Sequence, residues 1–510
     1  MTDALPVNDY VRKILDARVY DAAVVTPLDP MRRLSRRLGC DALLKREDLQ
    51  PVFSFKIRGA YNKAARLDAP ALARGLICAS AGNHAQGVAL SAQKLGARAV
   101  IVMPVTTPQI KIDAVRHLGG EIVLKGDAFD EAYAHARALE AEQGLTFLHP
   151  FDDPDVIAGQ GTIGVEILQQ HPGPVEAIFV PVGGGGLAAG VAAYVKFLRP
   201  ETKVIGVEPV EAACMKEAIA AGRRVELPRV GLFADGVAVR QAGEETFRLC
   251  RDLLDDVLLC DTDAICAAVK DIFEDTRVIA EPAGALSLAG LKAYAAEHPA
   301  RTGALIAIAS GANMNFDRLR HVAERAEIGE AHEILLGVAI PETRGSYRAF
   351  IERLGRRVIT EFNYRYAGPG DAHVFVGLRL RDARAEKPKL VAELKSMGYG
   401  VLDMSADETA KLHVRYMVGG RAGALLPERV LRCEFPERPG ALSDFLDCLG
   451  TDFNITLFHY RNHGADYGRV LFGVEAGEKD RARLDDRLAR LGYPYEDETD
   501  NPAYHMFLKG

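Results

Sequence analysis

The segment "AIFVPVGGGGLAAGVAAYVKFL", residues 177–198, is the stretch from which the fold is predicted. It opens with a short, continuously apolar run, which is typical of a buried strand. Four consecutive glycines follow, and then an alanine-rich stretch with helical character. Glycines lose much conformational freedom on folding, so packing alone explains four in a row poorly. The segment indicates a strand that ends in a glycine turn and continues into a helix.

The same pattern recurs on both sides of this segment, from about residue 40 to residue 320. Short apolar runs at 76–79, 98–104, 203–209 and 304–310 each adjoin a stretch with helical periodicity. Apolar strands that alternate with helices are typical of parallel sheets whose two faces are both covered. The sequence therefore predicts an α/β protein with open, mostly parallel sheets and helices on both faces.

The last third of the chain contains a repeat. Residues 335–355 ("LLGVAIPETRGSYRAFIERLG") parallel residues 430–450 ("VLRCEFPERPGALSDFLDCLG"), and "TEFNYR" at 360–365 parallels "TLFHYR" at 456–461. Each unit reads as strand, turn, helix, strand, strand, helix, so two copies of one small α+β module are expected. We expect a catalytic domain at 1–327 and modules at 333–405 and 428–499.

Composition excludes several classes of protein. The chain has 510 residues, of which 48% are hydrophobic, and its net charge is −7 without any basic stripe. Nucleic acid is therefore not an expected partner. No apolar run is long enough for a membrane span or a signal peptide. The eight cysteines are scattered, which fits free thiols in a reducing compartment, so a cytoplasmic protein is expected.

A lysine stands in apolar surroundings in "SFKIRGA", residues 54–60. Phe53, Phe55 and Ile57 are expected to surround the amine of Lys56. Burial lowers the pKa of a lysine because it disfavours the charged form, and a neutral amine is a nucleophile suited to Schiff-base formation. The alternative is an ordinary solvated lysine at the margin of a strand or helix.

Three further motifs lie where a predicted strand ends. "ASAGNHAQG" at 79–87 leads into a helix whose free N–H groups attract an anion, although an ordinary turn capped by Asn83 is the alternative. "PVGGGGL" at 181–187 is a second candidate anion site, and "IASGANMN" at 308–315 places Ser310 after a strand. Because open α/β sheets bind ligands at the carboxyl ends of their strands, we expect these motifs along one sheet edge.

The glycine turn also fits a dinucleotide fingerprint. Gly183, Gly185 and Ala188 match G-x-G-x-x-A, and Glu208 follows at the distance of a ribose-binding acid. An NAD-dependent oxidoreductase is therefore an alternative, but it needs neither a lysine in apolar surroundings nor a second anion turn. A pyridoxal phosphate enzyme uses an amine, a phosphate site, a carboxylate site and a partner for the ring nitrogen.

The motifs "SFKIRGA", "SAGNHAQG", "GGGGL" and "SGANMN", in that order, resemble the tryptophan-synthase-β class (fold type II) of pyridoxal phosphate enzymes. With the doubled C-terminal module, which resembles ACT-like regulatory repeats, the whole chain is similar to the biosynthetic threonine ammonia-lyases (threonine dehydratases). That resemblance implies a homotetramer that deaminates L-threonine to 2-oxobutanoate and ammonia, the first committed step of isoleucine biosynthesis. It also implies inhibition by isoleucine and relief by valine.

The resemblance assigns roles to individual residues. Lys56 would bind the cofactor covalently and remove the substrate Cα proton, with Phe55 beside it. Other cofactor contacts would be Asn83 at the phenolic oxygen, Ser310 at the ring nitrogen, and Gly183, Gly184, Gly185, Gly186 and Leu187 at the phosphate. The substrate carboxylate would lie against Ser80, Ala81, Gly82, Asn83 and His84. Tyr364 and Tyr460, matched between the repeats, would contact the effectors, and no metal site is expected.

Ala81 distinguishes between two activities found in this class of enzymes, ammonia-lyase and serine racemase. The serine racemases carry a serine at this position, and a methyl group cannot reprotonate Cα from the second face. Ala81 therefore favours an ammonia-lyase, with L-serine dehydratase and serine racemase as alternatives. A non-catalytic amino-acid sensor with this fold is a further alternative, against which Lys56, Asn83 and Ser310 together argue.

Overall fold

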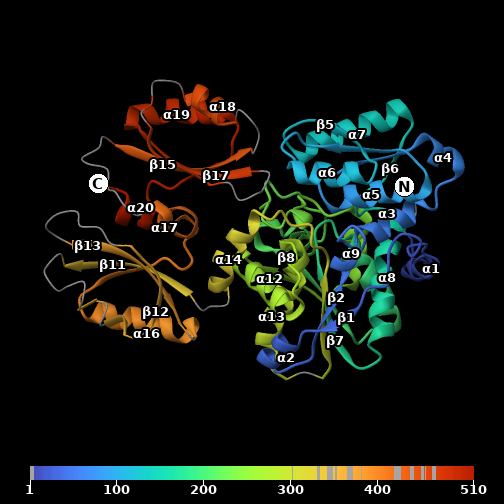
Figure 1. Ribbon diagram of the computed structural model, residues 1–510, viewed down its shortest axis with the longest axis horizontal. Helices are drawn as coiled ribbons and strands as arrows, with labels where there is room; N and C mark the ends of the chain where they lie inside the picture. Colours follow the sequence, from blue (N-terminus) through green and yellow to red (C-terminus); the bar gives the residue numbers. More distant parts are fainter. Residues whose placement is uncertain are drawn as a thin grey trace. The chain divides into compact units, whose positions relative to one another are not determined.

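The chain divides into two compact units, Met1–Ala326 and Glu327–Gly510. Figure 1 shows the computed structural model with its elements labelled. The structure describes residues 5–300, 302–329, 333–341, 349–350, 353–355, 357–363, 371–380, 382–417, 427–436, 441–449, 453, 455–461 and 467–509.

The first unit contains two sheets. The larger has six strands in the order β1 (Leu28–Pro30), β2 (Ala42–Arg46), β10 (Ala304–Ala309), β7 (Val175–Pro181), β8 (Lys203–Pro209) and β9 (Asp256–Cys260). All its neighbouring strands are parallel except β1 and β2. The smaller sheet is parallel throughout, in the order β5 (Glu121–Leu124), β4 (Ala99–Met103), β3 (Leu76–Ala79) and β6 (Thr146–Phe147).

The predicted α/β class with mostly parallel sheets is confirmed, but the single sheet edge expected for the motifs is wrong. The turn at 80–84 follows β3 of the smaller sheet, whereas the glycine turn and Ser310 follow β7 and β10 of the larger one. Apolar runs show that a strand is buried without showing which strand pairs with it, because pairing depends on packing between distant elements.

Fourteen α-helices accompany the strands among the described residues of this unit. They are α1 (Val7–Leu15), α2 (Arg32–Leu38), α3 (Lys56–Ala64), α4 (Ala69–Arg74), α5 (Asn83–Leu95), α6 (Gln109–His117), α7 (Phe129–Gln143), α8 (Pro154–Gln170), α9 (Gly186–Leu198), α10 (Cys214–Ala221), α11 (Glu244–Leu253), α12 (Thr262–Thr276), α13 (Pro282–Glu297) and α14 (Arg318–Gly329). Three 3₁₀ turns are η1 (Glu47–Leu49), η2 (Val210–Ala212) and η3 (Asp235–Val237).

Helices cover both faces of the larger sheet (Figure 1). Along β7, Ile178 and Val180 belong to a core formed with α8 and α9, whereas Phe179 belongs to a core formed with α12 and α13. Successive side chains of a strand point to opposite faces, so a strand buried on both faces must be apolar throughout. This explains why the strands read as continuous apolar runs.

The second unit contains two four-stranded antiparallel sheets with the same strand order. One runs β12 (Val358–Asn363), β13 (Asp371–Arg379), β11 (Glu333–Pro341), β14 (Gly400–Asp403), and the other β16 (Ile455–Arg461), β17 (Tyr467–Glu475), β15 (Glu428–Pro436), β18 (Tyr495–Asp497). The accompanying elements are α16 (Ala383–Ser396), the π-helical turn η4 (Ala410–Val414), α17 (Arg415–Met417), α18 (Ala441–Leu449), α19 (Glu478–Leu491) and α20 (Pro502–Phe507).

The register of these sheets repeats as the sequence does. A shift in strand pairing occurs between Ile359 and Glu361 in one module and between Ile455 and Leu457 in the other. The same irregularity at matched positions confirms that the two modules are copies of one fold. The short closing strands β14 and β18 were not expected from the sequence. In the part of the chain that the structure describes, no helix is both long and apolar enough to cross a membrane.

Candidate active site

Lys56 is the first residue of α3. Its Nζ atom donates a hydrogen bond to the carbonyl oxygen of Pro150 at 3.1 Å and lies 5.2 Å from the centre of the Phe55 ring. Burial lowers the pKa of Lys56 to about 8, and the Glu281 carboxylate partly opposes that change. A substantial fraction of this amine is therefore neutral near physiological pH, as nucleophilic and general-base chemistry requires.

The apolar neighbours of Lys56 do not all lie where the sequence suggested. Ile57 is fully buried and Phe55 is half-buried, but Phe53 exposes 57% of its surface. Phe53 has a φ of 54°, an uncommon value for a residue with a side chain. Its backbone carbonyl accepts a hydrogen bond from the N–H of Ala312 at 2.9 Å, so this strained turn joins the Lys56 segment to the chain after β10. The expectation that Phe53 encloses the amine is wrong.

The glycine turn after β7 has no room for side chains. A Cβ atom at Gly184 would overlap the Phe151 ring, and one at Gly186 would lie 3.0 Å from the Phe151 Cα atom. Gly185 has a φ of 97°, which disfavours any other residue. The turn leads directly into α9 with Leu187 buried, and the first N–H groups of a helix have no partner within it. This is a backbone cradle suited to a phosphate.

A fixed segment joins this cradle to the lysine. Pro150, which accepts the Lys56 hydrogen bond, is followed by Phe151 against the glycines and by Asp152. The Asp152 carboxylate accepts hydrogen bonds from the N–H groups of the first three residues of α11, at 2.8–3.2 Å. In turn, the Thr246 hydroxyl on α11 donates to the Gly184 carbonyl at 2.6 Å. Residues 150–152 therefore hold the amine and the cradle at a defined separation.

The turn after β3 presents the N-terminus of α5. Gly82 is the N-cap residue and makes no capping bond, so the alternative of Asn83 as an ordinary cap is wrong. Ser80, Ala81, Gly82 and Asn83 are half-buried, and the Ser80 hydroxyl accepts a hydrogen bond from the Gly82 N–H at 3.2 Å. Helix N-terminal N–H groups together with the dipole favour a carboxylate here.

His84 contributes no positive charge to this turn. Burial lowers the pKa of its imidazole to about 3, and the Lys56 charge lowers it further. Its Nε2 atom lies 2.8 Å from the Leu148 carbonyl oxygen, so the neutral ring donates there. Only the backbone of His84 remains to meet an anion.

The side-chain amide of Asn83 is oriented by two residues. Its Nδ2 atom donates to Glu281 Oε1 at 2.6 Å, and its Oδ1 atom accepts from Asn313 Nδ2 at 2.7 Å. Asn313 also donates to the Val52 carbonyl at 2.7 Å, so both of its amide hydrogens are used. One Asn83 hydrogen is left for a ligand. Sequence reasoning missed Glu281, because nothing local marks a glutamate before a helix as a site residue.

Glu281 is 4% exposed, and its burial raises the pKa of the carboxyl to about 7, with a further rise from Asp235 and an opposing effect of the Asn83 hydrogen bond. A Cβ atom on Gly311 would overlap its Oε1 atom, which explains the glycine after Ser310. Asp235 itself binds Lys111 at 2.6 Å and Arg318 at 3.3 Å. These two cations hold the pKa of Asp235 well below its usual range although burial alone would raise it.

Ser310 lies at the end of β10, buried between two site elements. Its hydroxyl donates to the Ala283 carbonyl at 3.3 Å, and its backbone carbonyl accepts from the Phe55 N–H at 3.2 Å. Gly311 pairs with Ser54 in an isolated bridge. The structure thus brings the Lys56 segment, the Ser310 segment and, through Glu281, the Asn83 turn together.

Glu208 is not available to a ribose. It is fully buried, and its two oxygens accept hydrogen bonds from the N–H groups of Met215 and Lys216 at 2.8 and 2.9 Å. These N–H groups belong to the first turn of α10, so the carboxylate serves as a cap for that helix. The dinucleotide interpretation of the glycine turn is therefore wrong.

The residues present fit pyridoxal phosphate. The backbone cradle at 183–187, where Cβ atoms would collide, fits a phosphate, and a buried amine of lowered pKa fits an aldehyde. The Ser310 hydroxyl fits a pyridine nitrogen, because it can both donate and accept a hydrogen bond. Of the two tyrosines expected to contact effectors, Tyr364 lies outside the described residues. Tyr460 pairs through its backbone with Val470 on β17, and its side chain is not described.

Comparison with known proteins agrees with this site. Residues 19–311 match the family model of pyridoxal-phosphate dependent enzymes, and residues 324–414 and 420–508 each match the C-terminal regulatory domain of threonine dehydratase. The chain is 58% identical to a biosynthetic L-threonine dehydratase of Burkholderia multivorans, over 98% of this chain and 99% of that protein.

Two further relatives extend the comparison. The Escherichia coli biosynthetic L-threonine dehydratase is 55% identical over the whole of both chains. The solved structure of processed threonine deaminase isoform 2 from Solanum lycopersicum is 52% identical, with a TM-score of 0.62 over 63% of this chain and 88% of that one. The chain therefore belongs to the biosynthetic threonine dehydratase family of pyridoxal-phosphate-dependent enzymes.

Proposed function

We propose that this chain is a threonine ammonia-lyase, which converts L-threonine to 2-oxobutanoate and ammonia as the first committed step of isoleucine biosynthesis. The observation that carries the proposal is the amine of Lys56, which donates to the Pro150 carbonyl in the segment that packs against the glycine cradle. Pyridoxal phosphate, when bound, delocalises the electrons that remain when a substrate Cα–H bond breaks. Lys56 would hold its aldehyde, Gly183–Leu187 its phosphate, Asn83 its phenolic oxygen and Ser310 its ring nitrogen.

Lys56 is the base of the proposed reaction. Its amine has a pKa of about 8, much nearer to neutral pH than that of an exposed lysine, as an effective general base requires. It removes the Cα proton of threonine, after which the β-hydroxyl group leaves. The water lost in this elimination is regained when the nitrogen is hydrolysed away, so the products are 2-oxobutanoate and ammonia.

The N-terminus of α5 would orient the substrate. The N–H groups of the turn from Ser80 to His84 would bind the substrate carboxylate, since the imidazole of His84 is neutral and turned to Leu148. Ala81 lies in this turn, and its methyl side chain carries no exchangeable proton. Elimination is therefore proposed over racemisation, while L-serine remains a second candidate substrate because the same groups would also hold it.

The regulatory part of the proposal concerns the second unit. We infer that isoleucine inhibits threonine deamination and that valine relieves this inhibition. The functional domains would span 1–327, 333–405 and 428–499. Tyr364 and Tyr460 would contact the effectors. We also propose that the protein is a cytoplasmic homotetramer. Size-exclusion chromatography coupled to light scattering tests the number of subunits.

One assay tests the central proposal. Purified protein is supplied with pyridoxal phosphate and L-threonine, and 2-oxobutanoate is measured with and without isoleucine. Pyruvate from L-serine and D-serine formation are measured in parallel. We expect 2-oxobutanoate as the major product and suppression by isoleucine. D-serine as the dominant product would overturn the assignment in favour of a racemase.

A further inference from the structure

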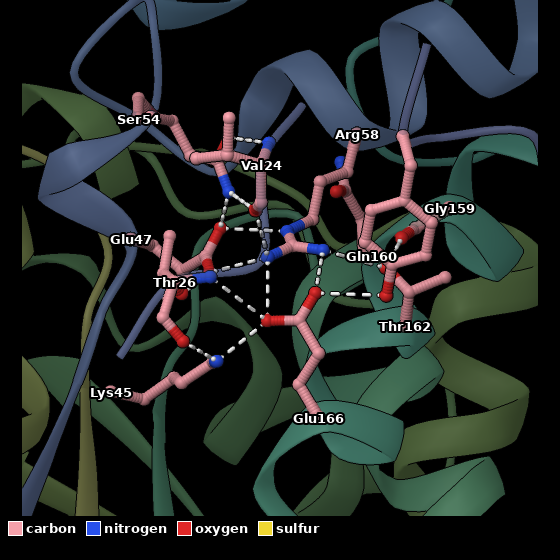
Figure 2. Close-up of polar contacts among 12 residues, drawn as sticks. Val24, Thr26, Lys45, Glu47, Ser54, Arg58, Gly159, Gln160, Thr162 and Glu166 are labelled. Carbon is pink, nitrogen blue, oxygen red and sulfur yellow. Dashed lines mark hydrogen bonds and ion pairs between the residues drawn. The ribbon is translucent and has the colours of Figure 1, made fainter. Parts of the chain in front are cut away.

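Four fully buried charged residues lie behind the catalytic lysine, and we call them the α3 charge cluster: Lys45, Glu47, Arg58 and Glu166. Lys45, Glu47 and Arg58 are 0% exposed and Glu166 is 2% exposed. Figure 2 shows that the two carboxylates face the same guanidinium. Two positive and two negative charges balance, which allows the group to be buried without uncompensated charge.

Arg58 forms two forked ion pairs at the centre of the cluster. Its Nε and Nη2 atoms donate to the two oxygens of Glu47, both at 2.7 Å. Its Nη1 and Nη2 atoms donate to the two oxygens of Glu166 at 2.6 and 3.0 Å. Thr162 Oγ1 and the Val24 carbonyl accept further bonds at 3.1 and 3.3 Å. The planar guanidinium is therefore fixed in direction as well as in place.

The remaining charges tie Glu166 to the sheet. Lys45 Nζ on β2 donates to Glu166 Oε2 and to the Thr26 carbonyl, both at 2.6 Å. The Thr26 hydroxyl donates to Glu47 Oε1 at 2.5 Å. Figure 2 shows these bonds linking the strand, the helix that carries Glu166 and the helix that carries Arg58.

The cluster acts on the first turn of α3, where Lys56 lies. Lys56 and Arg58 are two residues apart, about 200° around a helix, so they leave α3 on opposite sides. Behind α3, Gly59 donates its N–H to Gln160 Oε1 on α8 at 3.2 Å, and a Cβ atom at Gly159 would lie 2.7 Å from the Arg58 carbonyl. The chain just before α8 supplies Pro150, the hydrogen-bond acceptor of Lys56.

A buried ion cluster is a poor source of stability, because the desolvation of its charges offsets most of their attraction. Directional contacts are what such a cluster provides. We propose that Arg58, with Glu47 and Glu166, is a positioning residue that fixes the position of the Lys56 amine relative to residues 150–152 and the cofactor. This inference rests on the proposed function. Arg58, Glu47 and Glu166 are buried against one another, so their role would be exerted through α3.

Loosening the first turn of α3 should displace the amine without removing it. A misplacement of about 1 Å typically costs about 100-fold in rate. The Arg58→Lys variant retains the charge but cannot form both forks. We expect its kcat for threonine to fall about 10- to 100-fold with little change in KM. The pH dependence of the absorbance of the lysine-bound cofactor should also shift.

The matched control is Arg325→Lys. Arg325 is 4% exposed, and its Nε atom donates to Asp263 at 2.5 Å, so it is another buried arginine of the same unit, away from α3. We expect this variant to lose comparable thermal stability while keeping its kcat and its cofactor spectrum. A second test variant, Glu47→Gln, preserves shape and removes one fork, so the inference remains testable if Arg58→Lys does not fold.

The results separate this inference from the proposed function. Arg58→Lys or Glu47→Gln with wild-type kcat and cofactor titration would overturn the positioning role, as would an equal loss of kcat in Arg325→Lys. If the wild-type protein forms no 2-oxobutanoate, the proposed function fails. The cofactor titration still decides whether Arg58 positions Lys56.

Discussion

At the residue scale, the chemistry of the site comes from the neighbours of each group. An exposed lysine keeps its proton well above pH 8, yet burial brings the pKa of Lys56 to about 8. An exposed glutamic acid is ionised at pH 7, yet burial and Asp235 raise the pKa of Glu281 to about 7. Two groups with opposite ordinary charges thus titrate within about one pH unit of each other.

The Lys56→Ala variant should lose turnover by many orders of magnitude and still fold. The change would remove the proposed cofactor attachment and the proposed base together, and the effects of groups that act as one unit are not additive. Threonine turnover and circular dichroism are the measurements. A variant that retains a tenth of the wild-type rate without added amine would contradict the assignment.

Glu281→Gln should change stability in a pH-dependent way. Because the folded pKa is raised to about 7, the stability that Glu281 contributes is present below pH 4.5 and is lost as pH rises through 7. Gln keeps an oxygen for the Asn83 N–H. The difference in melting temperature between this variant and the wild type should therefore favour the variant more at pH 8 than at pH 5.

The control for this prediction is Glu121→Gln. Glu121 pairs with Arg98 at 2.8 Å on an exposed strand, and its hydrogen bond to Arg98 lowers the pKa of the carboxyl despite some burial. Its stabilising effect is present at high pH, so the pH trend should have the opposite sign and a small size. Equal trends in the two variants would refute the buried-acid explanation.

At the element scale, the turn between β7 and α9 is specified by what packs against it. The glycines are required because Phe151 and Val237 occupy the space that side chains would need. The carbonyl oxygens of Gly184 and of Gly183 face Thr246 and Cys214 behind the turn. The carbonyl oxygens of the cradle are therefore bonded to the protein, and the N–H groups at the start of α9 remain for a ligand.

Gly184→Ala should weaken cofactor binding about 5- to 150-fold, because overpacking of this kind costs about 1–3 kcal/mol. Adding Phe151→Ala should restore part of the loss, since the methyl group would then have room. Gly96→Ala is the control: its φ is 64°, but a Cβ atom there meets nothing within 4 Å. That variant should lose stability without losing cofactor affinity, as measured by absorbance titration.

At the scale of the whole molecule, the second unit is built as one body. In each sheet, one face packs under the module's own helices, while the other joins a shared core that includes Leu335, Phe375, Val430 and Leu471. Helix α20, at the end of the chain, contributes Tyr504 and Phe507 to that shared core. Both modules should therefore respond together when an effector binds either of them.

A chain cut after residue 327 should still bind cofactor and deaminate threonine, because the site residues all precede that point. It should lose its response to isoleucine, since allostery needs an element that differs between states, with a coupling free energy of about 1–3 kcal/mol. Threonine saturation curves with each effector provide the measurement. A truncated enzyme that stays fully sensitive to isoleucine would place the effector in the catalytic unit.

Substituting Tyr364 or Tyr460 with leucine should weaken inhibition and leave the rate at saturating threonine unchanged. Because the two modules are not identical in sequence, the two variants should differ in their responses to isoleucine and to valine. The same saturation curves test this. Identical effects of both variants on both effectors would argue against separate effector sites.

The sequence alone was sufficient for the local features of this protein. Runs of apolar residues placed β3, β4, β7, β8 and β10, because hydrophobic periodicity is a local property. The glycine turn, the lysine and the turn at 80–84 were found from composition within a few residues. The two copies of the C-terminal module were predicted from a sequence repeat. The strand pairing repeats in the same way, with a register shift at matched positions of both sheets.

Only the tertiary structure decided how distant segments meet. It divided the motifs between two sheets, turned Glu208 toward α10 and placed Glu281, 198 residues away, on the Asn83 amide. It also joined Arg58 to Glu166 across 108 residues. No local pattern encodes such pairs, because each depends on which faces pack together and on which buried polar groups then require a partner.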